Sequence, residues 1–151
     1  MSEEISKDEF YMREALKLAK RAYEEDEVPI GAVIVGERTI IAKGYNQTEK
    51  LNDVTAHAEM LAITAAENYI GGKYLTECTL YVTIEPCPMC AAALHWAHIT
   101  RIVYGAKDPK KGYSLFSPSL IHSKTEVVSG ELEKECAELI QKFFREKRQG
   151  L

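Results

Sequence analysis

The stretch Thr83-Ile-Glu-Pro-Cys87-Pro-Met-Cys90 carries two thiols three residues apart, where an apolar run gives way to an alanine-rich one. This pattern predicts a strand that ends near Ile84 and a helix that begins near Pro88. Positions i and i+3 share one face of a helix, so both sulfurs can point at one ion. A helix N-terminus, with its free N–H groups and positive dipole end, favours the thiolate form that binds metals.

A second polar segment, Ala56-His57-Ala-Glu59, lies about thirty residues earlier. His57 can supply a third, neutral nitrogen ligand, and three protein ligands with an open fourth position are typical of catalytic zinc. In the first turn of a helix, Glu59 and His57 can both border a ligand that lies across the helix end. A carboxylate there can take a proton from a water molecule and pass it to a leaving nitrogen. The alternative is a purely structural zinc site, which gains nothing from an uncoordinated Glu59.

The length and composition predict one globular domain that spans residues 1–151. The chain is 46% hydrophobic and 28% charged, which suits a single domain with a sizeable core. No apolar run approaches the roughly 18 residues of a membrane span, and the acidic start lacks an apolar signal region. The four cysteines then favour metal binding in a reducing, cytoplasmic setting over disulfides. The net charge of −4 does not by itself suggest a nucleic-acid binder.

Helical and strand patterns alternate along the chain. Ser6 is a candidate N-cap, with Glu9 completing a capping box. Thr55 is a candidate cap for the helix that follows, although Asp53 can instead hold the turn. We interpret Glu24–Glu27 as a solvated acidic turn. The periodicity predicts helices over 7–23, 57–69, 88–97 and 130–147, and strands over 28–35, 39–45, 79–84, 101–105 and 126–128.

These elements predict an α/β fold with about five strands and helices on both faces of the sheet. The polar site is expected at the carboxyl ends of the strands.

The combined pattern, His-x-Glu followed by Pro-Cys-x-x-Cys, is typical of zinc nucleoside and nucleobase deaminases. The chain resembles the cytidine-deaminase-like superfamily and, within it, the bacterial tRNA-specific adenosine deaminases, over nearly its full length. The resemblance implies a three-layer α/β/α sandwich with a mixed five-stranded sheet, whose first two strands are antiparallel and last three parallel. It also implies a homodimer. The segments that carry it are Val28–Val33, Asn46, Thr55–Glu59, Leu80–Cys87, Val103–Asp108 and Phe143–Arg145.

The resemblance implies a hydrolytic deaminase that converts adenosine to inosine at the wobble position of a tRNA anticodon. One zinc ion per subunit would be bound by His57, Cys87 and Cys90, and Glu59 would move the protons. The target base would be flipped out of the anticodon stem-loop, because unstacked loop bases are what sequence-specific RNA-binding proteins read.

Four further residues match family positions at the substrate. Asn46 matches a residue that contacts the base, and Ala58 matches one whose backbone N–H does so. Val28 and Pro29 match positions that line the pocket. Each also has a structural interpretation: Asn46 can satisfy backbone groups at a strand end, Val28 can be plain core, and Pro29 can stop an edge strand.

Other reactive or aromatic residues fit structural roles better. Cys78 and Cys136 fall on element patterns and are expected to be small buried apolar residues. His95 or His98 as a fourth metal ligand would close the site and leave Glu59 without a role. Two aromatic residues, Trp96 and Tyr104, are assigned to the core or to a dimer interface.

The segment Gly112–Pro118 departs from the family pattern, because it is bulkier and more apolar than the small-residue run found in many relatives. This departure bears on RNA contacts more than on zinc chemistry. Basic residues gather in the second half of the chain and can form a local phosphate-binding surface, or they can merely complement a helix dipole. They are Lys107, Lys110, Lys111, Lys124, Lys142, Arg145, Lys147 and Arg148.

Three hypotheses remain from the sequence. The first is a tRNA adenosine deaminase, which Phe143–Arg145 and the basic tail favour. The second is a deaminase of a free base or nucleoside such as guanine, whose enzymes share the motifs around His57 and Cys87. The third is a non-catalytic, zinc-stabilised binding domain, against which Glu59 argues.

Overall fold

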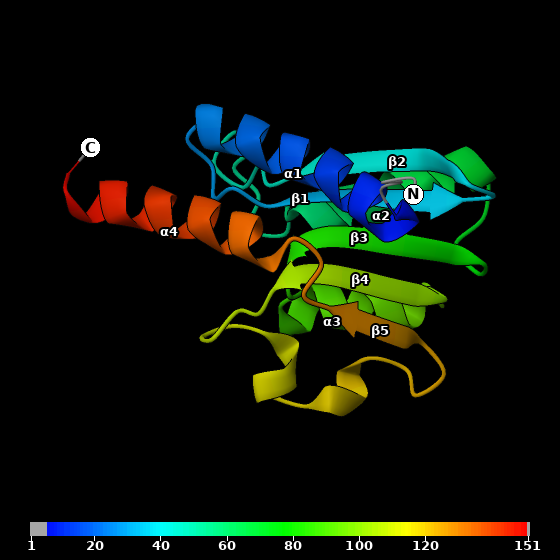
Figure 1. The fold of residues 1–151 in the computed structure, drawn as a ribbon. Helices are drawn as coiled ribbons and strands as arrows, with labels where there is room; N and C mark the ends of the chain where they lie inside the picture. Colours follow the sequence, from blue (N-terminus) through cyan, green and yellow to red (C-terminus); the bar gives the residue numbers. More distant parts are fainter. Residues whose placement is uncertain (1–5, 151) are drawn as a thin grey trace, which may run out of the picture.

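Five strands form one mixed sheet in the order β2-β1-β3-β4-β5 in the computed structural model, which describes residues 6–150. β1 pairs antiparallel with both β2 and β3, whereas β3, β4 and β5 run parallel. The predicted sheet and its two parts are confirmed (Figure 1). The strands are β1 (Gly31–Gly36), β2 (Thr39–Tyr45), β3 (Cys78–Ile84), β4 (Arg101–Ala106) and β5 (Glu126–Ser129).

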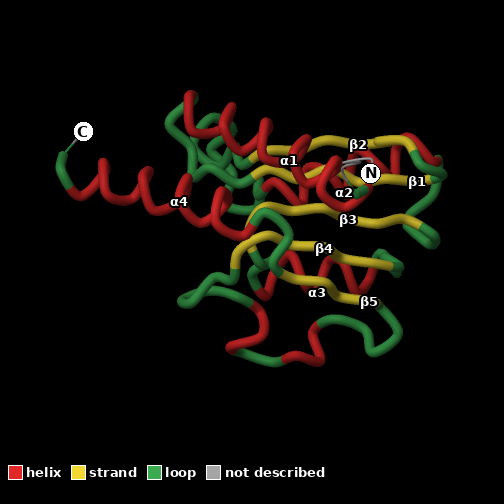
Figure 2. Tube along the Cα trace, viewed as in Figure 1, coloured by secondary structure: helices red, strands yellow, loops and turns green. Residues whose placement is uncertain are grey.

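Helices cover both faces of this sheet, which confirms the predicted three layers (Figures 1 and 2). α1 and α4 pack on one face, against β1, β3 and β4, and α2 packs beside α3 on the other. Two short 3-10 turns, Tyr113–Leu115 and Pro118–Leu120, lie in the connection from β4 to β5. The helices are α1 (Lys7–Glu24), α2 (Ala58–Ile70), α3 (Pro88–Trp96) and α4 (Glu133–Arg148). Within residues 6–150, no helix has the length and apolar character to cross a membrane.

The strands divide the core into two halves, because successive side chains point to opposite faces of a sheet. Ile34, Leu80 and Ile102 belong to the cluster under α2 and α3. Their neighbours in sequence, Val33, Tyr81 and Val103, belong to the cluster under α1 and α4. The continuous apolar runs of β1 and β3 follow from this burial on both faces.

Local capping explains where the helices begin and end. The Ser6 hydroxyl accepts a hydrogen bond from the Glu9 N–H at 3.1 Å, which confirms the predicted N-cap. Gly71, at φ 79°, ends α2 in the left-handed region that glycine tolerates best. Asp53 accepts from both the backbone N–H and the hydroxyl of Thr55, so Asp53 holds that turn, and His57 itself occupies the N-cap of α2.

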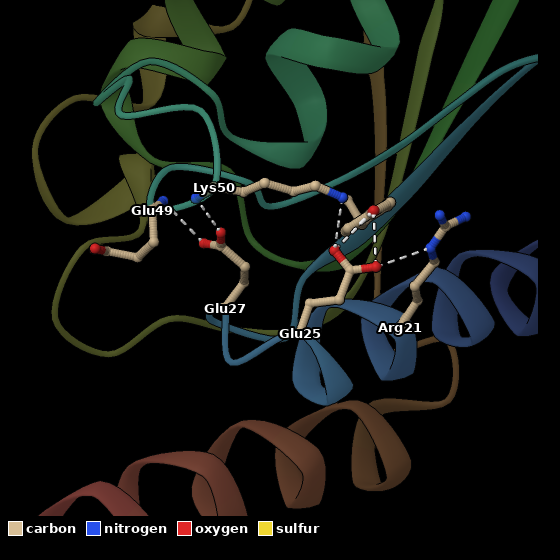
Figure 3. A network of polar contacts seen from close by, with 6 residues as sticks. Arg21, Glu25, Glu27, Glu49 and Lys50 are labelled. Carbon is tan, nitrogen blue, oxygen red and sulfur yellow. Dashed lines mark hydrogen bonds and ion pairs between the residues drawn. The ribbon is translucent and has the colours of Figure 1, made fainter.

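The acidic turn after α1 is exposed at Glu24, Glu25 and Asp26, as expected, but not at Glu27. Glu27 is only 2% exposed, and its carboxylate accepts the backbone N–H groups of Glu49 and Lys50 at 3.1 and 2.7 Å. The neighbouring Glu25 carboxylate accepts from Lys50 and from Arg21 (Figure 3). The prediction failed at Glu27 because its two donors lie more than twenty residues away in the sequence.

Of the four residues that we assigned to structural roles, three are buried, and for the fourth only one of two alternatives remains. Cys78, Cys136 and Tyr104 are buried, as expected of core residues. Trp96 is 77% exposed, so its assignment to the core was wrong. Its location at the end of α3 leaves the alternative of a subunit interface.

Candidate active site

The end of β3 and the start of α3 place the two thiols. Cys87 is the N-cap of α3, Pro88 opens the first turn, and Cys90 lies within that turn. Proline suits this position because its missing N–H would have no partner there. The two cysteines therefore lie at the carboxyl end of a parallel strand, as the sequence predicted.

His57 reaches the same edge of the sheet from β2 and the loop that follows it. α2 packs very closely on β2 at Gly44, where an added Cβ would lie 2.4 Å from the carbonyl oxygen of Ala58. Only glycine permits that approach, which brings the N-terminus of α2 next to the sheet. His57, as the N-cap, thereby faces the first turn of α3.

The three predicted ligands converge with distances that fit one zinc ion. His57 Nδ1 lies 3.6 Å from Cys87 Sγ and 3.5 Å from Cys90 Sγ, and the three ligand atoms all lie within 4.8 Å of one another. Tetrahedral zinc, with Zn–S of about 2.3 Å and Zn–N of about 2.05 Å, separates the nitrogen and sulfur by roughly 3.6 Å. One imidazole and two thiolates also form a donor set that favours zinc over harder cations.

The thiols are poised to bind a cation. Hydrogen bonds from Cys90 and from His57 lower the pKa of Cys87 to about 4. The Cys87 thiolate, together with burial, raises the pKa of Cys90. The hydrogen bond to Cys87 also raises the pKa of His57. A lowered pKa at Cys87 suits metal binding, because the thiolate is the form of cysteine that binds metals.

Glu59 lies in the first turn of α2 and is 3% exposed. Burial raises the pKa of its carboxyl group to about 7. A side-chain hydrogen bond with Cys90 opposes this shift and places Glu59 beside the ligand cluster. A buried carboxyl group whose pKa lies near neutrality can both accept and release a proton, which suits general acid–base catalysis.

The four residues predicted at the substrate lie at this same edge, because β2 ends there and β1 begins there. Asn46 is 5% exposed and its backbone N–H donates to the carbonyl oxygen of Ile30 at 3.1 Å. Ala58 and Pro29 are buried, and Val28 is half-buried. Val28 also lines a cavity of about 740 Å³, which the turn after α1 shares with Thr48–Lys50 and α4.

Neither neighbouring histidine joins the ligand cluster. His95 Nδ1 donates to the carbonyl oxygen of Leu120 at 3.1 Å, and the ring of His98 stacks on Tyr74 with centroids 4.2 Å apart. Within residues 6–150, the group that could hold a metal ion therefore consists of His57, Cys87 and Cys90.

Two buried carboxylates beside the site had no predicted role. Glu27 holds the loop before α2, and Glu85, which is 4% exposed, accepts hydrogen bonds from the loop after β4. An acidic residue directly after the buried strand β3 was the one signal for Glu85. The partners of both carboxylates are distant in sequence, so that signal did not identify what they bind.

Comparison with known proteins agrees with this chemistry. Residues 5–106 match the cytidine and deoxycytidylate deaminase zinc-binding region. The tRNA-specific adenosine deaminase of Agrobacterium fabrum is 49% identical over 91% of this chain and 94% of its own length. A structure from a study of A-to-I editing by tRNA:A34 deaminases at the wobble position shares 46% identity and a TM-score of 0.80, covering 86% of this chain and 98% of its own.

A guanine deaminase structure from Bacillus subtilis is also similar. It shares 38% identity and a TM-score of 0.63, and the match covers 71% of this chain and 66% of that one. The match is shorter on both sides than that of the adenosine deaminases.

Proposed function

The chain belongs to the tRNA-specific adenosine deaminases, within the cytidine and deoxycytidylate deaminase zinc-binding family, and on this premise we propose that it converts adenosine to inosine at the wobble position of a tRNA anticodon. The observation that carries the proposal is the convergence of His57, Cys87 and Cys90 beside the buried Glu59.

His57, Cys87 and Cys90 would hold one zinc ion per subunit. Zinc with an open fourth position lowers the pKa of water to near 7 and so supplies a nucleophile at neutral pH. Hydrolysis adds water at C6 of adenine and releases the exocyclic nitrogen as ammonia. The protons of that water must reach the ring nitrogen N1 and the leaving amine, and Glu59 carries them. Its raised pKa suits both transfers.

The substrate base would lie against the residues at the mouth of the site. Asn46 contacts the base, Ala58 offers its backbone N–H, and Val28 and Pro29 line the pocket. Burial of Asn46 and Pro29 supports this, because buried side chains hold a fixed position from which to orient a ligand.

Basic residues at the same end of the molecule support a nucleic-acid substrate. The loop after β4 and helix α4 both extend from the end of the sheet toward which the arrow of β5 points (Figure 1). The loop carries Lys107, Lys110 and Lys111. The last turn of α4 carries Arg145, Lys147 and Arg148. A local positive surface can meet phosphates although the chain is acidic overall.

We further propose a cytoplasmic homodimer. The exposed aromatic side chains of Trp96 and Phe116, at 77% and 65%, support a subunit interface, because large exposed apolar groups often mark contact surfaces. The four free cysteines suit a reducing compartment.

Ammonia release by the zinc-loaded protein tests the substrate class. The protein is offered an anticodon stem-loop with a wobble adenosine and, in parallel, free adenine, adenosine, guanine and cytosine. Turnover of the stem-loop alone is the expected result. Turnover of guanine alone would replace the proposal with the second candidate, which the similarity to the Bacillus subtilis guanine deaminase favours.

A further inference from the structure

Glu85 is a buried carboxylate that none of the chemistry above uses. Its side chain accepts hydrogen bonds from the backbone N–H of Asp108 at 3.2 Å, and from the backbone N–H and hydroxyl of Ser114 at 3.1 and 2.6 Å. It is 4% exposed, so its desolvation must be offset by these donors. The carboxylate of Glu85, the residue that follows β3, thus binds both ends of the 108–114 loop.

The backbone on each side of Glu85 binds the same region. The Glu85 N–H donates to the carbonyl oxygen of Ala106 at 2.8 Å, and the Tyr113 N–H donates to that of Pro86 at 2.9 Å. Tyr113 itself is buried in the core under α2 and α3. The loop is therefore fastened to the two residues that directly precede the metal ligand Cys87.

Gly112 fits this arrangement closely. A Cβ built at Gly112 would lie 2.3 Å from Glu85 Oε1 and 2.7 Å from Oε2, which is far inside van der Waals contact. The carboxylate therefore occupies the space that any larger residue at position 112 would need. This accounts for the glycine that opens the segment whose sequence departs from the family pattern.

The 108–114 loop brings positive charge to the metal site. The Asp108 carboxylate accepts the backbone N–H groups of Lys110 and Lys111 at 3.0 and 2.9 Å, which shapes the turn. Both lysines are exposed. Tyr113 and Ser114, which follow these lysines in the chain, bind Pro86 and Glu85, so the loop is held next to the residues that precede Cys87.

We propose that Glu85 is a positioning residue, which fastens the 108–114 loop beside the metal ligands and holds the loop's lysines where the phosphates of the substrate pass. The part of this proposal that concerns phosphates rests on the proposed function. Because Glu85 does not contact the reacting atoms, its loss should weaken substrate binding and leave the chemical step unchanged.

The substitution Glu85→Gln tests this, because an amide nitrogen would then face N–H donors in place of an acceptor oxygen. For the anticodon stem-loop we expect KM to rise roughly tenfold, as for the loss of a charged hydrogen bond, with kcat within about twofold and zinc content unchanged. Gly112→Ala disturbs the same contact from the loop side and should give the same division between KM and kcat. Ser114→Ala removes one donor from an exposed residue and should give a smaller rise in KM, even if Glu85→Gln does not fold.

A second measurement is independent of activity. Trypsin cleaves after Lys110 and Lys111, so a released loop should be cut there several-fold faster in Glu85→Gln than in the wild type. Asp8→Asn is the matched control, because Asp8 is another carboxylate with several donors, but at the far end of the sheet. It should change neither KM nor cleavage at this loop.

Unchanged KM and unchanged cleavage would overturn the proposal, as would a loss of zinc or a fall in kcat alone. If the wild type fails to deaminate the stem-loop while Glu85→Gln still accelerates cleavage, the proposed function fails and the loop-fastening role stands.

Discussion

Two polar clusters lie at opposite ends of the sheet, and they differ in how their charges are balanced. At the amino-terminal ends of β4 and β5, Asp8 binds Arg101 through both carboxylate oxygens at 2.8 Å. Tyr81 donates to Asp8, and Arg101 also binds Glu126. At the carboxyl end of β3, His57, the two thiols and Glu59 converge without an opposite charge for each of them.

The difference separates a structural cluster from a chemical one. Hydrogen bonding to Arg101 lowers the pKa of Asp8, so this carboxylate stays ionised and paired. Burial raises the pKa of Glu59 to about 7, so this carboxyl group can exchange a proton near neutral pH. A cluster that satisfies its own charges stabilises the fold, whereas a cluster that needs a cation and a mobile proton is suited to catalysis.

Removal of a metal ligand should have the largest effect. Cys90→Ala deletes a proposed zinc ligand that is fully buried, and we expect loss of zinc and of measurable deamination. Cys78→Ala is the matched control, since Cys78 is also buried but lies in β3 away from the cluster. Metal content and ammonia release check both variants, and a Cys90→Ala protein that keeps stoichiometric zinc would contradict the assigned ligand set.

Glu59→Gln should come next. It removes the proton carrier but keeps the side-chain volume, so we expect kcat to fall by about 10²- to 10⁴-fold with zinc retained. The melting temperature should not fall, because the substitution removes a buried ionisable group. Metal analysis, thermal unfolding and turnover would be measured on one preparation. Full turnover would remove Glu59 from its role.

Glu27→Gln should have an intermediate effect. It disrupts the carboxylate that accepts the Glu49 and Lys50 N–H groups and so loosens the loop between Asn46 and His57. We expect a loss of about 1–3 kcal/mol in the free energy of unfolding and a higher KM. Glu24→Gln, an exposed residue in the same segment, is the control for denaturant unfolding. Equal stability of the two variants would show that Glu27 does not hold the loop.

Asp8→Asn should have the smallest effect, about 1 kcal/mol of stability with unchanged kcat and KM. The folded-state pKa of Asp8 lies below its ordinary value of 3.8, so its ionised form stabilises the fold above that pH. This contribution should be lost as pH falls through the lower, folded-state pKa. Chemical unfolding at several pH values should therefore show the gap between wild type and variant closing in acid. A gap that grows in acid would contradict this.

The convergence of the candidate metal ligands was predictable because these residues lie in two short motifs at element ends. To place His57, Cys87 and Cys90, it was enough to predict where one strand ends and where two helices begin. The hydrophobic periodicity of the sequence predicts these points. Glu27 and Glu85 were not predictable in this way, since each binds backbone N–H groups of loops that are more than twenty residues away. Backbone donors leave no signature in the sequence, so Glu27 was interpreted as solvated together with the exposed residues before it.

The exposure of Trp96 excludes one of its two predicted assignments, the core, and leaves the subunit interface. A tryptophan near the end of an alanine-rich helix suits the core by composition. The helix ends at that residue, however, and the Trp96 side chain is 77% exposed whereas Leu94 is fully buried. The burial of a residue at a helix end depends on where the helix stops, and sequence patterns fix that point only to within roughly one or two residues.

The most direct test of wobble-position deamination uses one anticodon stem-loop that carries an adenosine at the wobble position and a second adenosine elsewhere in the loop. After incubation with the zinc-loaded protein, inosine is located by sequencing and quantified by mass spectrometry. We expect inosine at the wobble position alone. Equal conversion of both adenosines, or an unmodified stem-loop alongside deamination of free guanine, would contradict the proposed function.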